Sequence, residues 1–254
     1  MKRYISIILS VAFSLLCIFN LSAADSKRLA EANKLYAAEK YAEADSLYTA
    51  VLQEEGSSAA LYYNLGNAKY KQGEIASAIL NYERALKLDP NNEDIHFNLE
   101  MAKAQTTDKI EELDKFFLSE WNKSLQGVFS SNGWSRLAII CFLLTLGGAA
   151  LYFFGKVVAL RKSAFFVSIF TAIICVVSIV YAKRQKDEQL THDTAIIFAP
   201  STTGKGSPDE SGTDLFVLHE GTKVKVKSTL NGWVEIQMAD GNVGWIPEKD
   251  LEII

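Results

Sequence analysis

The sequence is short of the residues that build catalytic and metal centres. Its 254 residues include three cysteines and three histidines. The cysteines all lie in long apolar stretches: Cys17, Cys141 and Cys175. The histidines are scattered: His96, His192 and His219. Without Cys/His or Ser/His/Asp groupings, the sequence predicts no disulfide framework, no metal or cofactor site and no enzyme activity.

An excess of basic residues is also missing, since the formal net charge is −4. Nucleic-acid binding proteins need a basic surface, so nucleic acid is excluded as a predicted partner. The chain length allows two small domains and membrane segments, but no large catalytic core.

Charge is absent from two long stretches, 137–155 and 163–182. Each is close to the ~20 apolar residues that cross a bilayer as a helix. The link at 156–162 carries three basic residues and no acid. We therefore predict a two-helix transmembrane hairpin. The alternative is a pair of buried helices in a globular core, which rarely run so long without a polar face. Because neither span contains a charge, a transporter is disfavoured.

The first residues predict an export signal at 1–24. Lys2 and Arg3 precede an apolar run, and Ser22 and Ala24 occupy the small-residue slots of a cleavage site. The alternative is an uncleaved anchor helix. Basic residues flank the second span on both sides, at 156–162 and at 183–186, so loop charge alone does not orient the hairpin. The export signal predicts a bacterial inner-membrane protein with both soluble domains in the periplasm.

Residues 25–118 read as helix and show a period of 34 residues. The segment 59–92 resembles a tetratricopeptide repeat, with seven residues on the signature positions: Tyr62, Leu65, Gly66, Ala78, Tyr82, Ala85 and Pro90. An earlier repeat at about 25–58 follows the pattern more loosely, and 93–107 predicts a capping helix. The small residues Gly66 and Ala78 allow two antiparallel helices to touch.

Tetratricopeptide arrays bind an extended peptide or a partner helix in the groove lined by their first helices. The predicted groove residues are Asn33, Tyr36, Tyr63, Asn64, Asn67 and Tyr70. Asn33 and Asn64 match the asparagines of a carboxylate clamp. Leu29, Asp94 and Asn98 stand where the clamp has basic residues, which argues against it. The alternative is that these polar residues merely solvate the helix face.

Apolar residues recur at helical spacing in the segment before the first span, and Trp121 and Trp134 bracket it. Tryptophan prefers the headgroup level of a bilayer. We predict an amphipathic, membrane-proximal segment at 119–136. The alternative is a linker packed against the repeat.

Residues 192–254 predict a small all-β domain with strands at 195–198, 215–218, 223–229, 233–238 and 243–246. Asn231-Gly232 and Asp240-Gly241 are hairpin turns, and 201–212 reads as a mobile insertion. The pattern resembles a bacterial SH3-like barrel. Such domains bind cell-wall peptides or proteins, and the resemblance implies a binding surface at Trp233, Trp245 and Pro247. The alternative is that the tryptophans serve packing alone, and Asp250 replaces a platform tyrosine.

Taken together, the fold class is a multidomain membrane protein: an all-α tetratricopeptide repeat, a transmembrane hairpin and an all-β SH3-like barrel. This order resembles the BatE-type proteins of the Bacteroides aerotolerance operon, and the stretches NEDIHFNLE, SSNGWS and DGNVGWIPEKDLE carry the likeness. The resemblance implies a scaffold in a membrane-bound complex with von Willebrand A-domain proteins and a MoxR-type ATPase. The alternative function is a peptidoglycan-binding sensor or a cofactor of a wall enzyme.

Overall fold

The structure, a computed structural model, describes residues 27–110 and 117–254. The predicted export signal lies outside the described residues. The helices are α2 (Lys27–Ala37), α3 (Tyr41–Glu55), α4 (Ala59–Lys71), α5 (Ile75–Leu88), α6 (Glu93–Lys103), α7 (Phe117–Gly127), α8 (Ser131–Phe154) and α9 (Val158–Leu190). The strands are β1 (Thr194–Ile197), β2 (Ser201–Lys205), β3 (Asp214–His219), β4 (Lys223–Leu230), β5 (Trp233–Gln237), β6 (Val243–Pro247) and β7 (Leu251–Ile253), and η1 (Glu248–Asp250) is a 3-10 helix.

Helices α4 and α5 form the antiparallel pair that the segment 59–92 predicts. Ser58 caps the start of α4, where its Oγ accepts a hydrogen bond from the Leu61 N–H (3.2 Å). Gly73 takes the positive φ of the turn between the helices. A Cβ on Gly66 would lie 2.7 Å from the buried ring of Tyr82, so glycine is required for the helices to approach. The helical repeat is confirmed.

Helices α8 and α9 form the apolar hairpin, and are 24 and 33 residues long. Within the described residues, these are the two helices long and apolar enough to cross a membrane. Their large apolar side chains point outward: Phe142 is 54% exposed and Phe170 is 65% exposed. Such exposure is unfavourable in water but suits lipid. Helix α9 continues past the apolar stretch to Leu190, so the polar connector is helical.

The C-terminal region is an antiparallel sheet. Its seven described strands lie in the order β3-β2-β6-β5-β4-β1-β7. Asn231 and Gly232 both have positive φ and make the predicted turn between β4 and β5. The antiparallel sheet is confirmed, whereas its closure into an SH3-like barrel stays a prediction.

Strand β2 corrects one expectation, because it begins the segment 201–212 that the sequence predicts to be a mobile insertion. Its sequence, STTGK, has no apolar alternation. The strand forms through its neighbours instead. Thr202 is buried and its Oγ1 donates to Asp250 Oδ2 (2.7 Å). A side chain at Gly204 would overlap the ring of Phe216 on the paired strand β3. Tertiary contacts therefore override a weak local signal.

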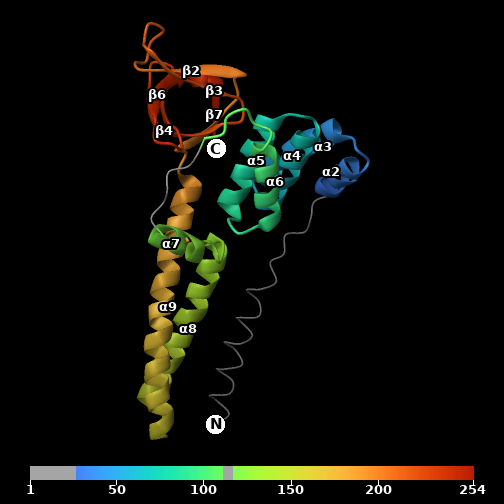
Figure 1. The fold of residues 1–254 in the computed structure, drawn as a ribbon. Helices are drawn as coiled ribbons and strands as arrows, with labels where there is room; N and C mark the ends of the chain where they lie inside the picture. Colours follow the sequence, from blue (N-terminus) through green and yellow to red (C-terminus); the bar gives the residue numbers. More distant parts are fainter. Residues whose placement is uncertain (1–26, 111–116) are drawn as a thin grey trace.

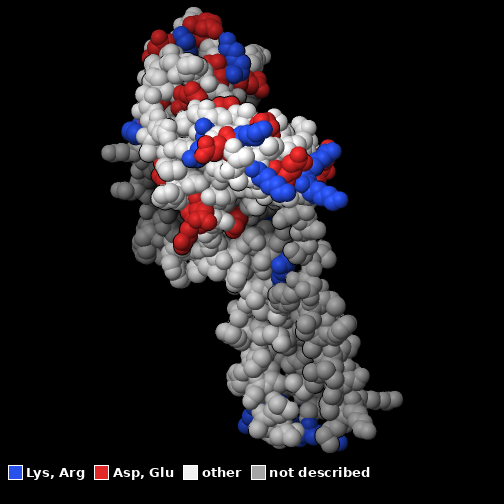
Figure 2. All heavy atoms as spheres, turned by 90° about the vertical axis from the view of Figure 1, so that its right-hand side faces the viewer, with Lys and Arg blue, Asp and Glu red and all other residues white. Residues whose placement is uncertain are grey.

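The repeat and the sheet together form a head (residues 27–110 and 194–254) at one end of the hairpin (Figure 1). The link between α8 and α9 lies at the other end. Figure 2 shows acidic and basic side chains interspersed over the head, and Lys and Arg again at the far tip of the hairpin. Charges of both signs suit a surface in water and give no single-sign field.

Candidate functional site

Asparagine side chains link the first helices of successive repeats. Through its Oδ1, Asn33 of α2 accepts hydrogen bonds from Tyr48 OH (2.8 Å) and Asn64 Nδ2 (3.3 Å). Tyr48 comes from the second helix of the same repeat and Asn64 from the first helix of the next. One asparagine oxygen thus joins three helices.

The same arrangement recurs 34 residues later, which is the period of the repeat. Asn67 Oδ1 accepts from Tyr82 OH (2.8 Å) and from Asn98 Nδ2 (2.8 Å). We call these six residues the asparagine–tyrosine ladder. Burial raises the pKa of Tyr48 to about 12 and that of Tyr82 above its usual range. Both phenols therefore remain protonated donors at neutral pH.

The six predicted groove residues lie on the first helices of the two repeats, α2 and α4. The three asparagines, Asn33, Asn64 and Asn67, belong to the ladder. Tyr36, Tyr63 and Tyr70 are half-buried. Since the Asn33 and Asn67 oxygens are occupied by internal hydrogen bonds, these two asparagines can offer a ligand only their Nδ2 donors, beside the half-buried tyrosines. Their role in binding stays a prediction.

The predicted groove set left out residues that continue this face on α6, namely Phe97, Asn98 and Met101. Phe97 is 67% exposed, and Met101 is also exposed. Asn98 donates to Asn67 and also to Tyr63 OH (3.0 Å). The period could have found them, because adding 34 to Tyr63, Asn64 and Asn67 gives these three positions. The positions where a carboxylate clamp would need cations carry Leu29, Asp94 and Asn98, so none of them is basic.

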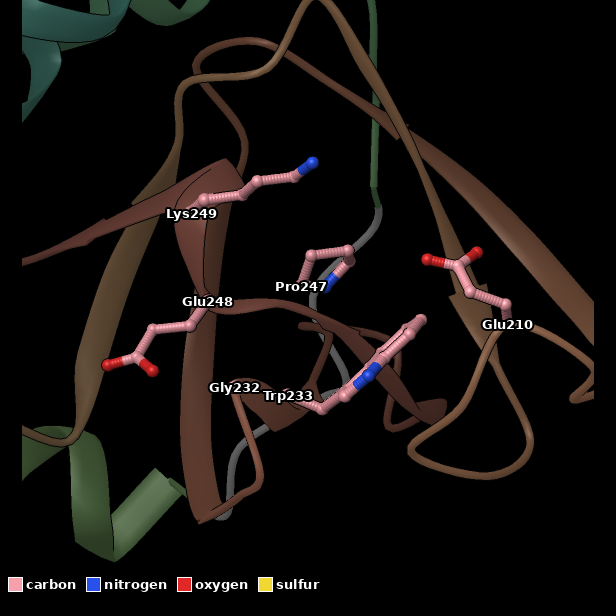
Figure 3. A pocket seen from close by; sticks show the side chains of 6 residues that line it. All are labelled: Glu210, Gly232, Trp233, Pro247, Glu248 and Lys249. Atoms are coloured by element: carbon pink, nitrogen blue, oxygen red, sulfur yellow. The ribbon is translucent and has the colours of Figure 1, made fainter.

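A second candidate site lies on the sheet, where a pocket of about 540 Å³ surrounds Trp233 (Figure 3). Trp233 and Pro247 are cross-strand partners on β5 and β6, which explains why they share it. The lining is completed by Glu210, Gly232, Glu248 and Lys249. Trp245 pairs with Glu235 and Lys205 and lies outside the lining. The pocket is therefore a tryptophan face bordered by two carboxylates and one ammonium group.

Asp108, in the segment after α6, ties the repeat to the sheet. Its carboxylate accepts hydrogen bonds from the His219 N–H (2.7 Å), the Thr222 hydroxyl (2.6 Å) and, at 2.7 Å, contacts His219 Nδ1. Burial opposes the charged form, but the hydrogen bonds from Thr222 and His219 outweigh it, so the pKa of Asp108 is lowered. The carboxylate is charged at neutral pH and holds the β3–β4 turn.

Helix α5 makes a second set of contacts with the sheet. Arg84 donates to Glu252 Oε1 (3.0 Å) and to the Ile253 carbonyl (2.8 Å), and Lys223 Nζ lies 2.7 Å from Glu83 Oε2. Ile196 and Ile254 are buried in the same apolar cluster as α5 and α6. Ion pairs around a shared apolar core make the head one packed unit.

Helix α7 crosses the hairpin close to the head (Figure 1). The carbonyl of Gln126 accepts from Trp134 Nε1 (2.8 Å) and from Gln185 Nε2 (2.8 Å), which joins α7, α8 and α9. Trp134 is 8% exposed and packs on Phe129 and Tyr181. It is thus a packing residue, whereas Trp121 is 65% exposed.

Comparison with known proteins supports the repeat. A family model for the TPR repeat matches residues 66–99, which run from the middle of α4 through α5 into α6. No curated protein matches the chain. Tetratricopeptide repeats are protein-interaction modules without catalytic chemistry. Within the described part of the chain, no group of three His, Cys, Asp or Glu side chains could hold a metal ion.

Proposed function

We propose that this chain is a non-enzymatic adaptor of the bacterial inner membrane, which presents its head to protein partners in the periplasm. The observation that carries the proposal is the joining of an interaction repeat to a lipid-compatible hairpin through a packed head. A partner bound on the repeat would be held at a defined height above the membrane. The order of parts supports a place in an aerotolerance or envelope-stress complex of the BatE type, with von Willebrand A-domain proteins and a MoxR-type ATPase.

Photo-crosslinking tests the adaptor. A photoreactive residue replaces Tyr63 or Phe97 on the groove face, and the matched control replaces exposed Ser46 on α3. We expect discrete protein adducts from the two groove positions and none from Ser46. If the chain is membrane-integrated and none of the positions gives an adduct, the adaptor proposal is wrong.

The pocket at Trp233 favours a second candidate function, the binding of peptidoglycan. Aromatic faces flanked by polar groups suit small peptide and sugar ligands. The full chain in detergent is sedimented with purified peptidoglycan, with Trp233→Ala as the test variant and Trp245→Ala, outside the pocket, as the control. Loss of co-sedimentation in Trp233→Ala but not in Trp245→Ala supports peptidoglycan binding. Equal sedimentation of all three proteins contradicts it.

A further inference from the structure

A cleft of about 700 Å³ lies between the repeat and the head-side end of the hairpin. Its walls come from the starts of α4 and α8 and from the part of α9 that follows the apolar stretch. Hydroxyl and amide side chains supply most of its polar groups, including Ser58, Ser130 and Asn132. No acidic side chain lines the cleft among the described residues.

Two lysines give the cleft its charge. Lys183 and Lys186 are three residues apart on α9, so both lie on the same side of the helix. Both are exposed, and neither makes a hydrogen bond or an ion pair within the described part of the chain. Of the two acids that follow on α9, Glu188 accepts a hydrogen bond from Gln126 Nε2 (3.0 Å), and Asp187 lies outside the cleft lining and forms no ion pair with either lysine among the described residues. The cleft thus holds two positive charges without a fixed counterion.

Two helices also begin at this cleft. Ser58 caps α4 and Ser130 caps α8, and each accepts a backbone N–H at 3.2–3.3 Å. The unpaired N–H groups and the dipole at a helix start favour an anion. The two helix starts therefore reinforce the positive charge of the two lysines, and no acidic side chain of the cleft lining offsets it.

The position of the cleft relative to the apolar stretches indicates which anion would bind. It begins where the apolar stretches 137–155 and 163–182 end on the head side. If those stretches fill the hydrocarbon core, the cleft lies at the level of lipid headgroups. Phosphate is the common anion at that level, and basic pockets beside transmembrane helices bind such headgroups.

We propose that this cleft binds the headgroup phosphate of an anionic phospholipid, with Lys183 and Lys186 as its cationic ligands. The inference rests on the membrane anchoring proposed above. A bound headgroup would fix the repeat against the membrane surface. It also supplies a reason for basic residues on the head side of the second span, where the orientation of the hairpin does not call for them.

Native mass spectrometry of the full chain in gentle detergent tests the cleft, with phosphatidylglycerol and phosphatidylcholine as probes. We expect the wild type to retain phosphatidylglycerol over phosphatidylcholine by about thirtyfold, from two lysines near a headgroup. Lys183→Gln with Lys186→Gln should lose this preference. The matched control, Lys156→Gln with Lys162→Gln, removes the same charge at the other end of the hairpin and should retain it. Lys183→Arg with Lys186→Arg should also retain it.

If both double glutamine variants lost the preference for phosphatidylglycerol equally, the proposal would be overturned, because the effect would then depend on total charge. Displacement of the lipid by millimolar glycerol phosphate would overturn it in favour of a soluble phosphate ligand. Unchanged thermal unfolding of the glutamine variants excludes a folding defect. Carbonate extraction of membranes separates the two proposals. A wild-type chain that resists extraction but shows no lipid preference contradicts lipid binding in the cleft alone. A wild-type chain that is extracted contradicts membrane anchoring by the hairpin.

Discussion

Buried phenol groups explain why asparagine stands at positions 33 and 67. A buried Tyr82 hydroxyl needs an acceptor, and Asn67 Oδ1 is that acceptor. The same oxygen also receives Asn98 from the next helix, so one side chain satisfies a phenol and links two repeats. At the residue scale, the predicted groove asparagines therefore contribute to folding as well as to the surface.

Replacing Asn67 tests this role. Asn67→Ala leaves the Tyr82 hydroxyl without its partner, and we expect a loss of about 1–3 kcal/mol in the free energy of unfolding. Tyr82→Phe removes the unsatisfied group, so the double variant should lose less than the sum of the two single variants. Denaturant unfolding of the chain in detergent, followed by circular dichroism, measures both. Strictly additive losses would show that the hydrogen bond is not the cause.

At the scale of elements, the hairpin packs through small and hydroxyl side chains. Thr145 and Thr171 share a hydrogen bond across the helices (2.8 Å), and Gly148 faces Ser168. Helices in lipid associate through such close contacts because no hydrophobic force joins them there. Ala164 and Ser168, both small, are the residues nearest to Gly148 on the facing helix.

Two adjacent glycines provide a matched test of this packing. A side chain at Gly148 would overlap Ser168 and approach the Ala164 carbonyl, whereas Gly147 has open space around it. Gly148→Leu should force the helices apart and destabilise the hairpin by about 1–3 kcal/mol. Gly147→Leu should leave it nearly unchanged. The thermal unfolding midpoint in detergent measures the difference, and equal effects of the two variants would contradict the packing described.

At the scale of the whole molecule, the repeat and the sheet act as one body. Asp108 and Arg84 each bridge the two, and Ile254 lies in the core of the helical side. The sheet is connected to the hairpin directly, because β1 follows α9 after three residues. An adaptor needs this rigidity if it is to position a partner.

The Asp108 contact makes head stability depend on pH. Its folded pKa is lowered below 3.8, so its contribution is fully present above that value and is lost as the pH falls through the folded pKa. Asp108→Asn should lower the melting temperature at pH 7, and the gap from wild type should close below about pH 3.8. Asp209→Asn, whose carboxylate bonds within its own loop, should leave the interface intact. If the difference in melting temperature between Asp108→Asn and the wild type did not change with pH, the effect would come from packing and not from the charge of Asp108.

The proposed topology places the head in the periplasm and the link 156–162 in the cytoplasm. A reporter active only in the cytoplasm should be silent after Ile254 and active within the link. Leu143→Arg with Leu144→Arg adds about 3 kcal/mol for each charge at the centre of the first span. That span should then fail to insert, and the reporter after Ile254 should become active. A silent reporter in a membrane-bound double variant would contradict the hairpin.

Local signals in the sequence were enough for the repeat helices, the apolar helices and the β4–β5 hairpin. The period of 34 residues predicts the pairing of α4 with α5, because Gly66 and Tyr82 must meet wherever that pattern folds. The charge-free stretches predict α8 and α9 from length and composition alone. The Asn231-Gly232 turn predicts the β4–β5 hairpin, since both residues tolerate positive φ. In each case neighbours in sequence carry the physical cause.

The tertiary structure alone decided how these parts meet. The residues of strand β2 do not favour a strand by themselves. The strand forms because Thr202 donates a hydrogen bond to Asp250 and because Gly204 leaves room for the ring of Phe216. The head is joined by residues more than a hundred positions apart, such as Asp108 with His219 and Arg84 with Glu252. Lys183 and Lys186 line a cleft together with the start of α4 for the same reason. Contacts of this kind depend on the path of the whole chain, and no periodicity in sequence records that path.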